Sequence, residues 1–186
     1  MKVETIILNG KPRVGKDTFI TLSQDYLIQL GYSTEEYSLI DPIRNFAEHI
    51  DKSDNYRKAL HLMKKALDKC EEYSLQNLLV KKITAAADRV KYITSKKKLF
   101  IFINIREEKD IKEIKEKLLA KGITVKTVVV TADERVQNRE YGNAADDTPL
   151  TISKYDLHIT NDSTVDDLKM RISNNLSFFI GNSLQK

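Results

Sequence analysis

A glycine-containing segment near the beginning of the chain constrains the fold more than any other feature. It follows residues 3–9, a short run that is apolar apart from Glu4, Thr5 and the final Asn9. It reads Gly10-Lys11-Pro12-Arg13-Val14-Gly15-Lys16-Asp17-Thr18, which has the spacing Gly-x-x-x-x-Gly-Lys. Glycines at these two places let the backbone curl so that amide groups point inward, and a helix that follows adds the positive end of its dipole. Lys16 would then reach the β- and γ-phosphates of a nucleoside triphosphate. The alternative is a plain turn with a surface lysine, but the spacing favours a phosphate-binding loop. The residues expected to contact the phosphates are Gly10, Lys11, Val14, Gly15, Lys16, Asp17 and Thr18.

Apolar spacing along the rest of the chain predicts strands that alternate with helices. Strands are expected over residues 3–9, 32–39, 99–103, 124–131 and 155–160. Helices are expected from the loop to Gly31 and over residues 41–50, 54–72, 75–93, 107–121 and 164–180. Residues 99–103 are apolar throughout, so this run is expected to be the central strand. The order indicates an α/β fold with a mainly parallel sheet, helices on both faces, and ligands beyond the carboxyl ends of the strands.

Length and composition indicate one compact domain in a reducing compartment. With 186 residues, of which 41% are hydrophobic, the chain can bury a core without a disulfide or a metal. Its single cysteine, Cys70, can form no internal bridge, and its three histidines are too scattered to suggest a metal site, so we expect a cytoplasmic location. The apolar runs are too short for a signal peptide or a membrane span. A net charge of +4 without a basic tail gives no reason to expect nucleic-acid binding. The sequence does not decide whether the chain forms a homodimer.

The loop resembles that of a known group of enzymes. Gly-x-x-Arg-x-Gly-Lys-Asp-Thr looks like the loop of the bacteriophage-type deoxynucleoside monophosphate kinases, and Lys11, Arg13 and Asp17 are also similar to the loop of animal phosphomevalonate kinases. Both groups belong to the P-loop nucleoside monophosphate kinase superfamily. The close match covers the nine residues of the motif, while the order of strands and helices extends it weakly over the whole chain.

This resemblance implies a three-layer P-loop NTPase fold with a five-stranded, mainly parallel sheet. Residues 1–186 would form a single P-loop kinase domain, with a helical insertion that binds the acceptor at about 41–95 and a lid at about 132–150. It also implies ATP as donor, Mg²⁺, and an acceptor that already carries a phosphate.

Asp17 stands where a serine or threonine usually ligates Mg²⁺ in such loops. Either Asp17 binds the metal, directly or through water, or Thr18 supplies the hydroxyl; the alternative is an acidic residue that merely favours the helix dipole. Asn104 departs from the pattern of the related kinases, which place an aspartate there. If Asp17 compensates, the carboxylate has moved from the sheet to the loop; if it does not, the metal binds weakly or the chemistry is slow.

Phosphoryl transfer between two anions requires cations on the acceptor side as well. Arg106 lies just past the run 99–103, where related kinases place an arginine, and Arg44 follows Asp41-Pro42 as in their acceptor-binding segment. Arg13 in the loop could face either phosphate. An arginine suits each place because its planar fork holds phosphate oxygens bidentately, although a solvated position near a helix start is the alternative for Arg44 and Arg106.

The polar residues 132–150 contain Arg135 and Arg139, which are four apart and would share one face of a helix. In the kinases that the chain resembles this segment is the lid, whose arginines close over the phosphates and exclude water. The alternative is a solvated helical turn. By the same resemblance, Asn161-Asp162-Ser163 is where the adenine of the donor would lie.

The sequence therefore predicts an enzyme that transfers a phosphoryl group from ATP to a nucleoside monophosphate, most plausibly a deoxynucleotide, giving ADP and the diphosphate. The expected catalytic residues are Lys16, Arg13, Arg106, Arg135 and Arg139, and the expected acceptor ligands are Arg13, Arg44 and Arg106. Phosphomevalonate and dephospho-coenzyme A are alternative acceptors, and Asn104 leaves open a nucleotide-binding protein that has lost catalysis. A GTPase-like switch is disfavoured because neither Asp-x-x-Gly nor Asn-Lys-x-Asp occurs in the sequence.

Overall fold

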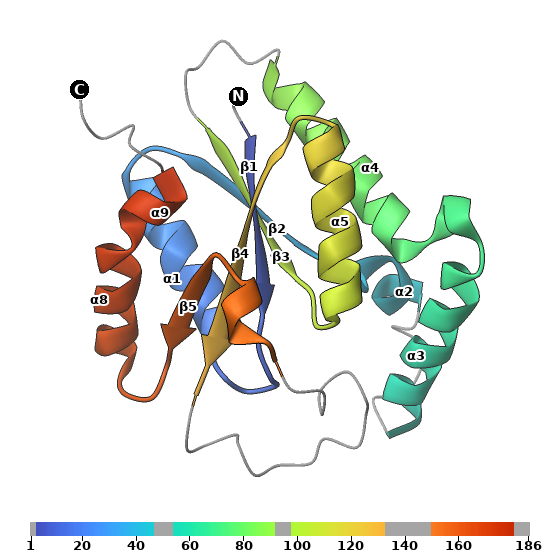
Figure 1. Cartoon of the computed structure of the whole chain (residues 1–186), viewed down its shortest axis with the longest axis horizontal. Helices are drawn as coiled ribbons and strands as arrows, with labels where there is room; N and C mark the ends of the chain where they lie inside the picture. The colour runs from blue at the N-terminus through green and yellow to red at the C-terminus, as the bar shows by residue number, and fades with distance from the viewer. Residues whose placement is uncertain (1–2, 47–53, 92–97, 133–149, 181–186) are drawn as a thin grey trace.

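The computed structural model describes residues 3–46, 54–91, 98–132 and 150–180. Its centre is a sheet of five parallel strands in the order β2-β3-β1-β4-β5 (Figure 1). The strands are β1 (Val3–Asn9), β2 (Ser33–Ser38), β3 (Leu99–Asn104), β4 (Thr124–Thr131) and β5 (Leu157–Thr160). The predicted parallel α/β sheet is confirmed, and the expected strand 124–131 has the predicted bounds.

Strand β1 occupies the middle of the sheet, between β3 and β4. The expectation that residues 99–103 form the central strand is therefore wrong by one position, since β3 lies between β2 and β1. Both strands are buried on both faces, but β1 also buries the polar residues Glu4, Thr5 and Asn9. An unbroken apolar run indicates that a strand is buried on both faces, but it does not indicate the position of that strand in the sheet.

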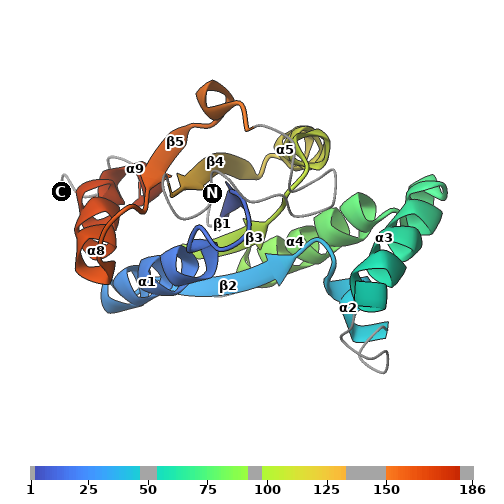
Figure 2. The same cartoon turned by 90° about the horizontal axis from the view of Figure 1, so that it is seen from below.

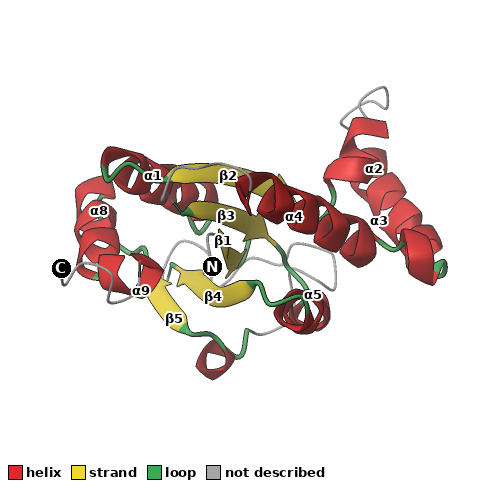
Figure 3. Cartoon of the chain, turned by 90° about the horizontal axis from the view of Figure 1, so that it is seen from above, coloured by secondary structure: helices red, strands yellow, loops and turns green. Residues whose placement is uncertain are grey.

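Helices cover both faces of the sheet (Figure 3). One face packs against α1 (Lys16–Gln29), α8 (Val165–Asn174) and α9 (Leu176–Ile180), and the other against α4 (Leu75–Lys91) and α5 (Glu108–Ala120). Side chains of β1 alternate between the two cores: Val3 and Ile7 belong to the α4/α5 core, and Ile6 and Leu8 to the α1/α8 core. The three layers predicted from the sequence are present.

Two helices project beyond the sheet at one end, α2 (Asp41–Phe46) and α3 (Asp54–Asp68) (Figure 2). They lie within residues 41–95, which the sequence predicts to form the acceptor-binding insertion. The predicted helix 54–72 ends earlier, because α3 stops at Asp68 and a separate 3₁₀ turn, η2 (Glu71–Tyr73), leads into α4. No helix in the described part of the chain is long and apolar enough to cross a bilayer.

The last predicted helix, 164–180, is divided at Asn175 into α8 and α9. It begins as a capping box, in which Thr164 and Asp167 each bond the other's backbone amide. At the break the side-chain Nδ2 of Asn175 donates to the carbonyl oxygen of Arg171 at 2.8 Å. The backbone amide of Asn175 donates to the same carbonyl at 3.2 Å, so both groups of this residue close the last turn of α8. The single long helix that was predicted is wrong at this residue.

Candidate active site

The segment between β1 and α1 curls tightly at the carboxyl edge of the sheet. Gly10, Arg13 and Gly15 have positive φ angles of 152°, 65° and 90°. Gly15 is the N-cap of α1 and has no side chain with which to cap it, so the first amides of the helix open toward the loop. Residues that change hand in this way turn successive amides toward one concave side, which is the geometry of an anion-binding nest.

Both loop glycines lie close to residues at the ends of other strands. A Cβ on Gly10 would lie 2.4 Å from the carbonyl oxygen of Val130, and a Cβ on Gly15 would lie 2.3 Å from Nδ2 of Asn161. The same Nδ2 donates to the carbonyl oxygen of Val14 at 2.9 Å. The loop is therefore held from beneath by the end of β4 and by the residue that follows β5.

Lys16 turns its side chain back over the loop. Its Nζ donates to the carbonyl oxygens of Gly10 and Lys11, both at 2.7 Å, and the residue is only 6% exposed. An ammonium group buried this deeply needs several partners, and these carbonyl dipoles supply part of what water would give. The structure thus brings the side chain of Lys16 to the backbone of Gly10 and Lys11, two other residues of the motif.

Asn104 ends β3 at the same edge, paired in register with Leu8 of β1 and Ser38 of β2. The chain then passes through Ile105, whose amide donates to the carbonyl oxygen of Leu8 at 3.0 Å, to Arg106, which is exposed. The connection that carries Arg106 therefore runs directly beside the strand that carries the loop.

The solved structures that superpose on this chain include APS kinases. The APS kinase CysC of Mycobacterium tuberculosis, in complex with AMPPNP and APS, superposes with a TM-score of 0.59 at 14% identity, covering 95% of this chain and 98% of the kinase. Its Cys556Ala mutant gives 0.55 at the same identity and coverage. The protein APE1195 gives 0.58 at 17% identity, covering 97% of each chain. No protein-family model matches the sequence, and no curated protein matches it.

The fold is that of the P-loop kinases. This confirms the P-loop NTPase fold expected from the loop and the element order. At 14–17% identity the likeness extends to the fold alone, so the specific resemblance to the phage deoxynucleoside monophosphate kinases stays a prediction.

Of the other predicted arginines, the structure describes Arg13 and Arg44. Arg13 is exposed on the loop at its positive φ. Arg44 is exposed on α2, with its Nη1 3.7 Å from Oδ1 of Asp41. Arg135 and Arg139 fall outside the described residues, so the structure says nothing of the predicted lid.

Carboxylates gather beside the first turn of α1, where Asp17 and Thr18 are both exposed. The pKa of Glu36, near the end of β2, is raised by partial burial and then by the negative charges of Asp17 and Asp41. Within the described residues no group of three or more histidine, cysteine or acidic side chains is arranged to hold a metal ion. The carboxylate of Asp17 and the hydroxyl of Thr18 are nevertheless hard oxygen ligands of the kind that Mg²⁺ takes together with substrate phosphates. These two residues stay the predicted metal ligands.

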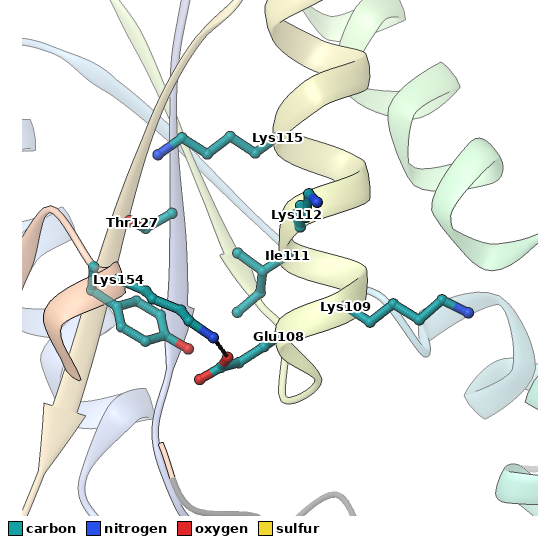
Figure 4. Close-up of a pocket in the computed structure, with 8 residues that line it drawn as sticks. Glu108, Lys109, Ile111, Lys112, Lys115, Thr127 and Lys154 are labelled. Atoms are coloured by element: carbon teal, nitrogen blue, oxygen red, sulfur yellow. Dashed lines mark hydrogen bonds and ion pairs between the residues drawn. The ribbon is translucent and has the colours of Figure 1, made fainter. Parts of the chain in front are cut away.

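A hollow of about 590 Å³ adjoins the site between α5 and β4 (Figure 4). Its described lining comes from α5, β4 and the 3₁₀ turn η3 (Ile152–Lys154) with the residue after it: Glu108, Lys109, Ile111, Lys112, Lys115, Thr127, Lys154 and Tyr155. Lys154 points at Glu108, with Nζ 2.8 Å from Oε2, and Lys115 Nζ lies 3.3 Å from Oδ2 of Asp156. Two of the four lysines are thus paired with carboxylates.

Three residues of the site have roles that were not predicted from the sequence. They are Asn9, Tyr155 and Asn161, whose side chain supports the loop. Nδ2 of Asn9 donates to the hydroxyl of Tyr155 at 2.6 Å and to the carbonyl oxygen of Arg106 at 3.1 Å. The available signal was a polar residue that ends the apolar run Ile6-Ile7-Leu8 immediately before the loop. Asn161 was expected near the adenine of the donor, whereas the contact seen here is with the loop backbone.

Proposed function

We propose that this chain transfers the γ-phosphoryl group of ATP to a nucleoside monophosphate, with a deoxynucleotide as the expected acceptor, producing ADP and the nucleoside diphosphate. The observation that carries the proposal is the curled loop between β1 and α1, with Lys16 folded over it, beside the connection that bears Arg106. A donor site and a cation for a second anion then lie at neighbouring strand ends, as transfer between two phosphates requires.

On the donor side, the loop amides and the amino end of α1 would hold the β- and γ-phosphates. Lys16 would exchange its bonds to the two loop carbonyls for phosphate oxygens, which compensate its charge more fully. Bound Mg²⁺, held by Asp17 or Thr18, supplies further neutralisation of the phosphate charge.

On the acceptor side, Arg106, Arg44 and Arg13 would bind the monophosphate, and Arg135 and Arg139 would close over the transferring group. An oxygen of the acceptor phosphate forms the new bond to the γ-phosphorus, while the bond from that phosphorus to the β–γ bridging oxygen breaks and the electron pair leaves with ADP. The attacking oxygen is already ionised, so no general base is required. Catalysis then consists of alignment and charge neutralisation, to which each of these residues contributes.

Other acceptors are the main alternative. Phosphomevalonate and dephospho-coenzyme A follow from the loop, and APS is added because an APS kinase shares the fold. Asn104 supports a different alternative, a nucleotide-binding protein that has lost catalysis, since an amide cannot supply the negative charge that related kinases place there.

The test is ADP release with Mg-ATP and a panel of ribo- and deoxynucleoside monophosphates, phosphomevalonate, dephospho-coenzyme A and APS. We expect one or a few monophosphates to accelerate release well above the rate with ATP alone, and Lys16→Met to abolish the acceleration. If no monophosphate accelerates release but another acceptor does, the nucleotide assignment is wrong and the kinase assignment stands. If no acceptor accelerates ADP release while ATP still binds, both kinase assignments are wrong and the chain is a nucleotide-binding protein without catalysis.

A further inference from the structure

The side chain of Asn9 joins three parts of the candidate site. Its Oδ1 accepts from the amide of Gly10 at 2.6 Å, and its Nδ2 donates to the carbonyl oxygen of Arg106 at 3.1 Å and to the hydroxyl of Tyr155 at 2.6 Å. Gly10 begins the loop, Arg106 follows β3, and Tyr155 comes shortly after the predicted lid. Asn9 is 1% exposed, so these bonds are made away from water.

Only an asparagine in this orientation satisfies all three partners. With the amide reversed, its NH₂ would face the N–H of Gly10 and its oxygen would face the carbonyl of Arg106, which places donor against donor and acceptor against acceptor. An aspartate would keep the bond from Gly10, but it has no hydrogen to give to Arg106 and would bury a charge. The identity of residue 9 is therefore set by what the amide joins.

Tyr155 belongs to a segment that is itself fixed to the start of α5. The carboxylate of Glu108 accepts from the amide of Thr151 at 2.9 Å and from Nζ of Lys154 at 2.8 Å. Burial raises the pKa of Tyr155, so its hydroxyl stays protonated at neutral pH. The partner that Asn9 finds there is thus in a constant ionisation state and on an anchored segment.

We propose that Asn9 and Tyr155 are positioning residues for phosphoryl transfer, which set the distance between the donor loop and the backbone of Arg106. The inference rests on the proposed function, because it assigns the loop to the donor and Arg106 to the acceptor. Neither residue needs to touch a substrate. Their contribution is to hold two phosphate sites in register, where a misplacement of about 1 Å can lower turnover about 100-fold.

The decisive variants are Tyr155→Phe, which removes one oxygen, and Asn9→Asp, which keeps the shape but removes both donors. Tyr32→Phe is the matched control, since Tyr32 precedes β2 at the opposite end of the sheet and packs its ring on Phe100. For each variant, kcat and KM for the best acceptor, the Kd of a non-hydrolysable ATP analogue, and hydrogen exchange of residues 9–16 and 104–108 are measured.

We expect Tyr155→Phe to lower kcat/KM for the acceptor about tenfold while the Kd of the ATP analogue changes less than about threefold. Exchange should rise in both segments together, and Tyr32→Phe should leave kinetics and exchange unchanged. The double variant, which combines Asn9→Asp with Tyr155→Phe, should have the same kcat/KM as Asn9→Asp alone, because both changes break the same chain of hydrogen bonds. If Asn9→Asp does not fold, Tyr155→Phe decides by itself.

Unchanged kinetics in Tyr155→Phe, or equal losses of ATP affinity and acceptor use, would overturn the positioning role. Should the wild-type chain show no transfer to any acceptor, the proposed function is wrong. Hydrogen exchange in the variants then tests by itself whether Asn9 connects the two segments. Joint loosening of the two segments then supports the mechanical connection through Asn9, and independent behaviour refutes it.

Discussion

Nζ of Lys64 lies 2.7 Å from Oδ2 of Asp110, so helix α3 is joined to helix α5 by a largely buried ion pair. Asp110 is 2% exposed and also accepts from Nε2 of Gln76, at 2.7 Å, while Lys64 pairs in addition with Glu107. Helices α3, α4 and α5 therefore meet at one carboxylate. The projecting helices of the expected acceptor-binding insertion are thus tied to the body of the fold beside Arg106.

Lys64→Met should destabilise the chain by about 3–5 kcal/mol, because it leaves the carboxylate of Asp110 buried without its cation. Lys65→Met, an exposed change on the same helix, should alter the free energy of unfolding by less than about 0.5 kcal/mol. Denaturant unfolding of the two variants measures both. Similar small effects would show that the pair contributes little.

The pH dependence of this pair follows from the pKa of Lys64. Burial alone would lower it, but hydrogen bonds to Asp110 and Glu107 raise it above the ordinary 10.5. A raised lysine pKa gives stability that is present below the ordinary value and is lost as the pH rises through the raised one. The stability difference between the wild type and Lys64→Met should therefore hold from about pH 7 to 9 and narrow only above about 10.5, as urea melts across that range would show.

Lys16→Met should leave the fold intact and remove most of the catalytic rate. The charge acts where negative charge is transferred, so we expect a loss of at least about 100-fold in kcat, equivalent to about 3 kcal/mol. Lys121→Met, at an exposed position after α5, is the control. Steady-state kinetics together with thermal unfolding separate the two effects, and near-normal turnover would count against the proposed donor site.

Arg13 allows the side chain and the backbone of the loop to be examined separately. Its φ of 65° is strained for any residue with a Cβ, so Arg13→Gly should be more stable than Arg13→Ala by about 1 kcal/mol. If the guanidinium contacts phosphate, both variants should lose turnover alike. Chemical denaturation and kcat/KM on the same pair of proteins provide the comparison; a Gly variant with full activity would remove Arg13 from the proposed site.

Arg106→Ala should raise KM for the monophosphate far more than KM for ATP, because the residue is assigned to the acceptor. Arg89→Ala provides the control, since Arg89 is exposed on α4 and its Nη2 lies 3.2 Å from Oε1 of Glu35. Initial rates with each substrate varied in turn measure the two constants. Equal effects on both substrates would overturn the acceptor role.

At the start of α8, hydrogen bonds from Ser163 and then Thr164 lower the pKa of Asp167 to about 2. A depressed carboxyl pKa contributes stability above the ordinary value of 3.8, and that contribution is lost as the pH falls through about 2. Carboxyl NMR titration should give Asp167 a pKa of about 2. In Ser163→Ala its midpoint should move up toward 3.8, and an unchanged midpoint would mean that the hydroxyl does not bond the carboxylate.

Most helices and strands could be predicted from local patterns, because apolar runs and helical spacing indicate which side of a segment is buried. The Gly10–Thr18 motif also located the loop correctly. What could not be predicted are contacts between residues far apart in the chain: Asn9 and Tyr155 are separated by 146 positions, and Val14 and Asn161 by 147. The burial of Asp110 could not be predicted for a related reason. In the sequence it is one of many charges on α5, and only packing against α3 and α4 shows that it is buried.

The close fit of Gly15 against Asn161 bears on how an inactive form of this protein should be made. Gly15→Ala would be a familiar way to disable such a loop, yet its methyl group would displace the side-chain amide of Asn161 from the carbonyl oxygen of Val14 and strain a backbone with φ of 90°. Any loss of activity would then be mixed with the loss of a contact that supports the loop. Lys16→Met is the cleaner knockout, since it removes charge at the mouth of the loop without asking the scaffold beneath to move.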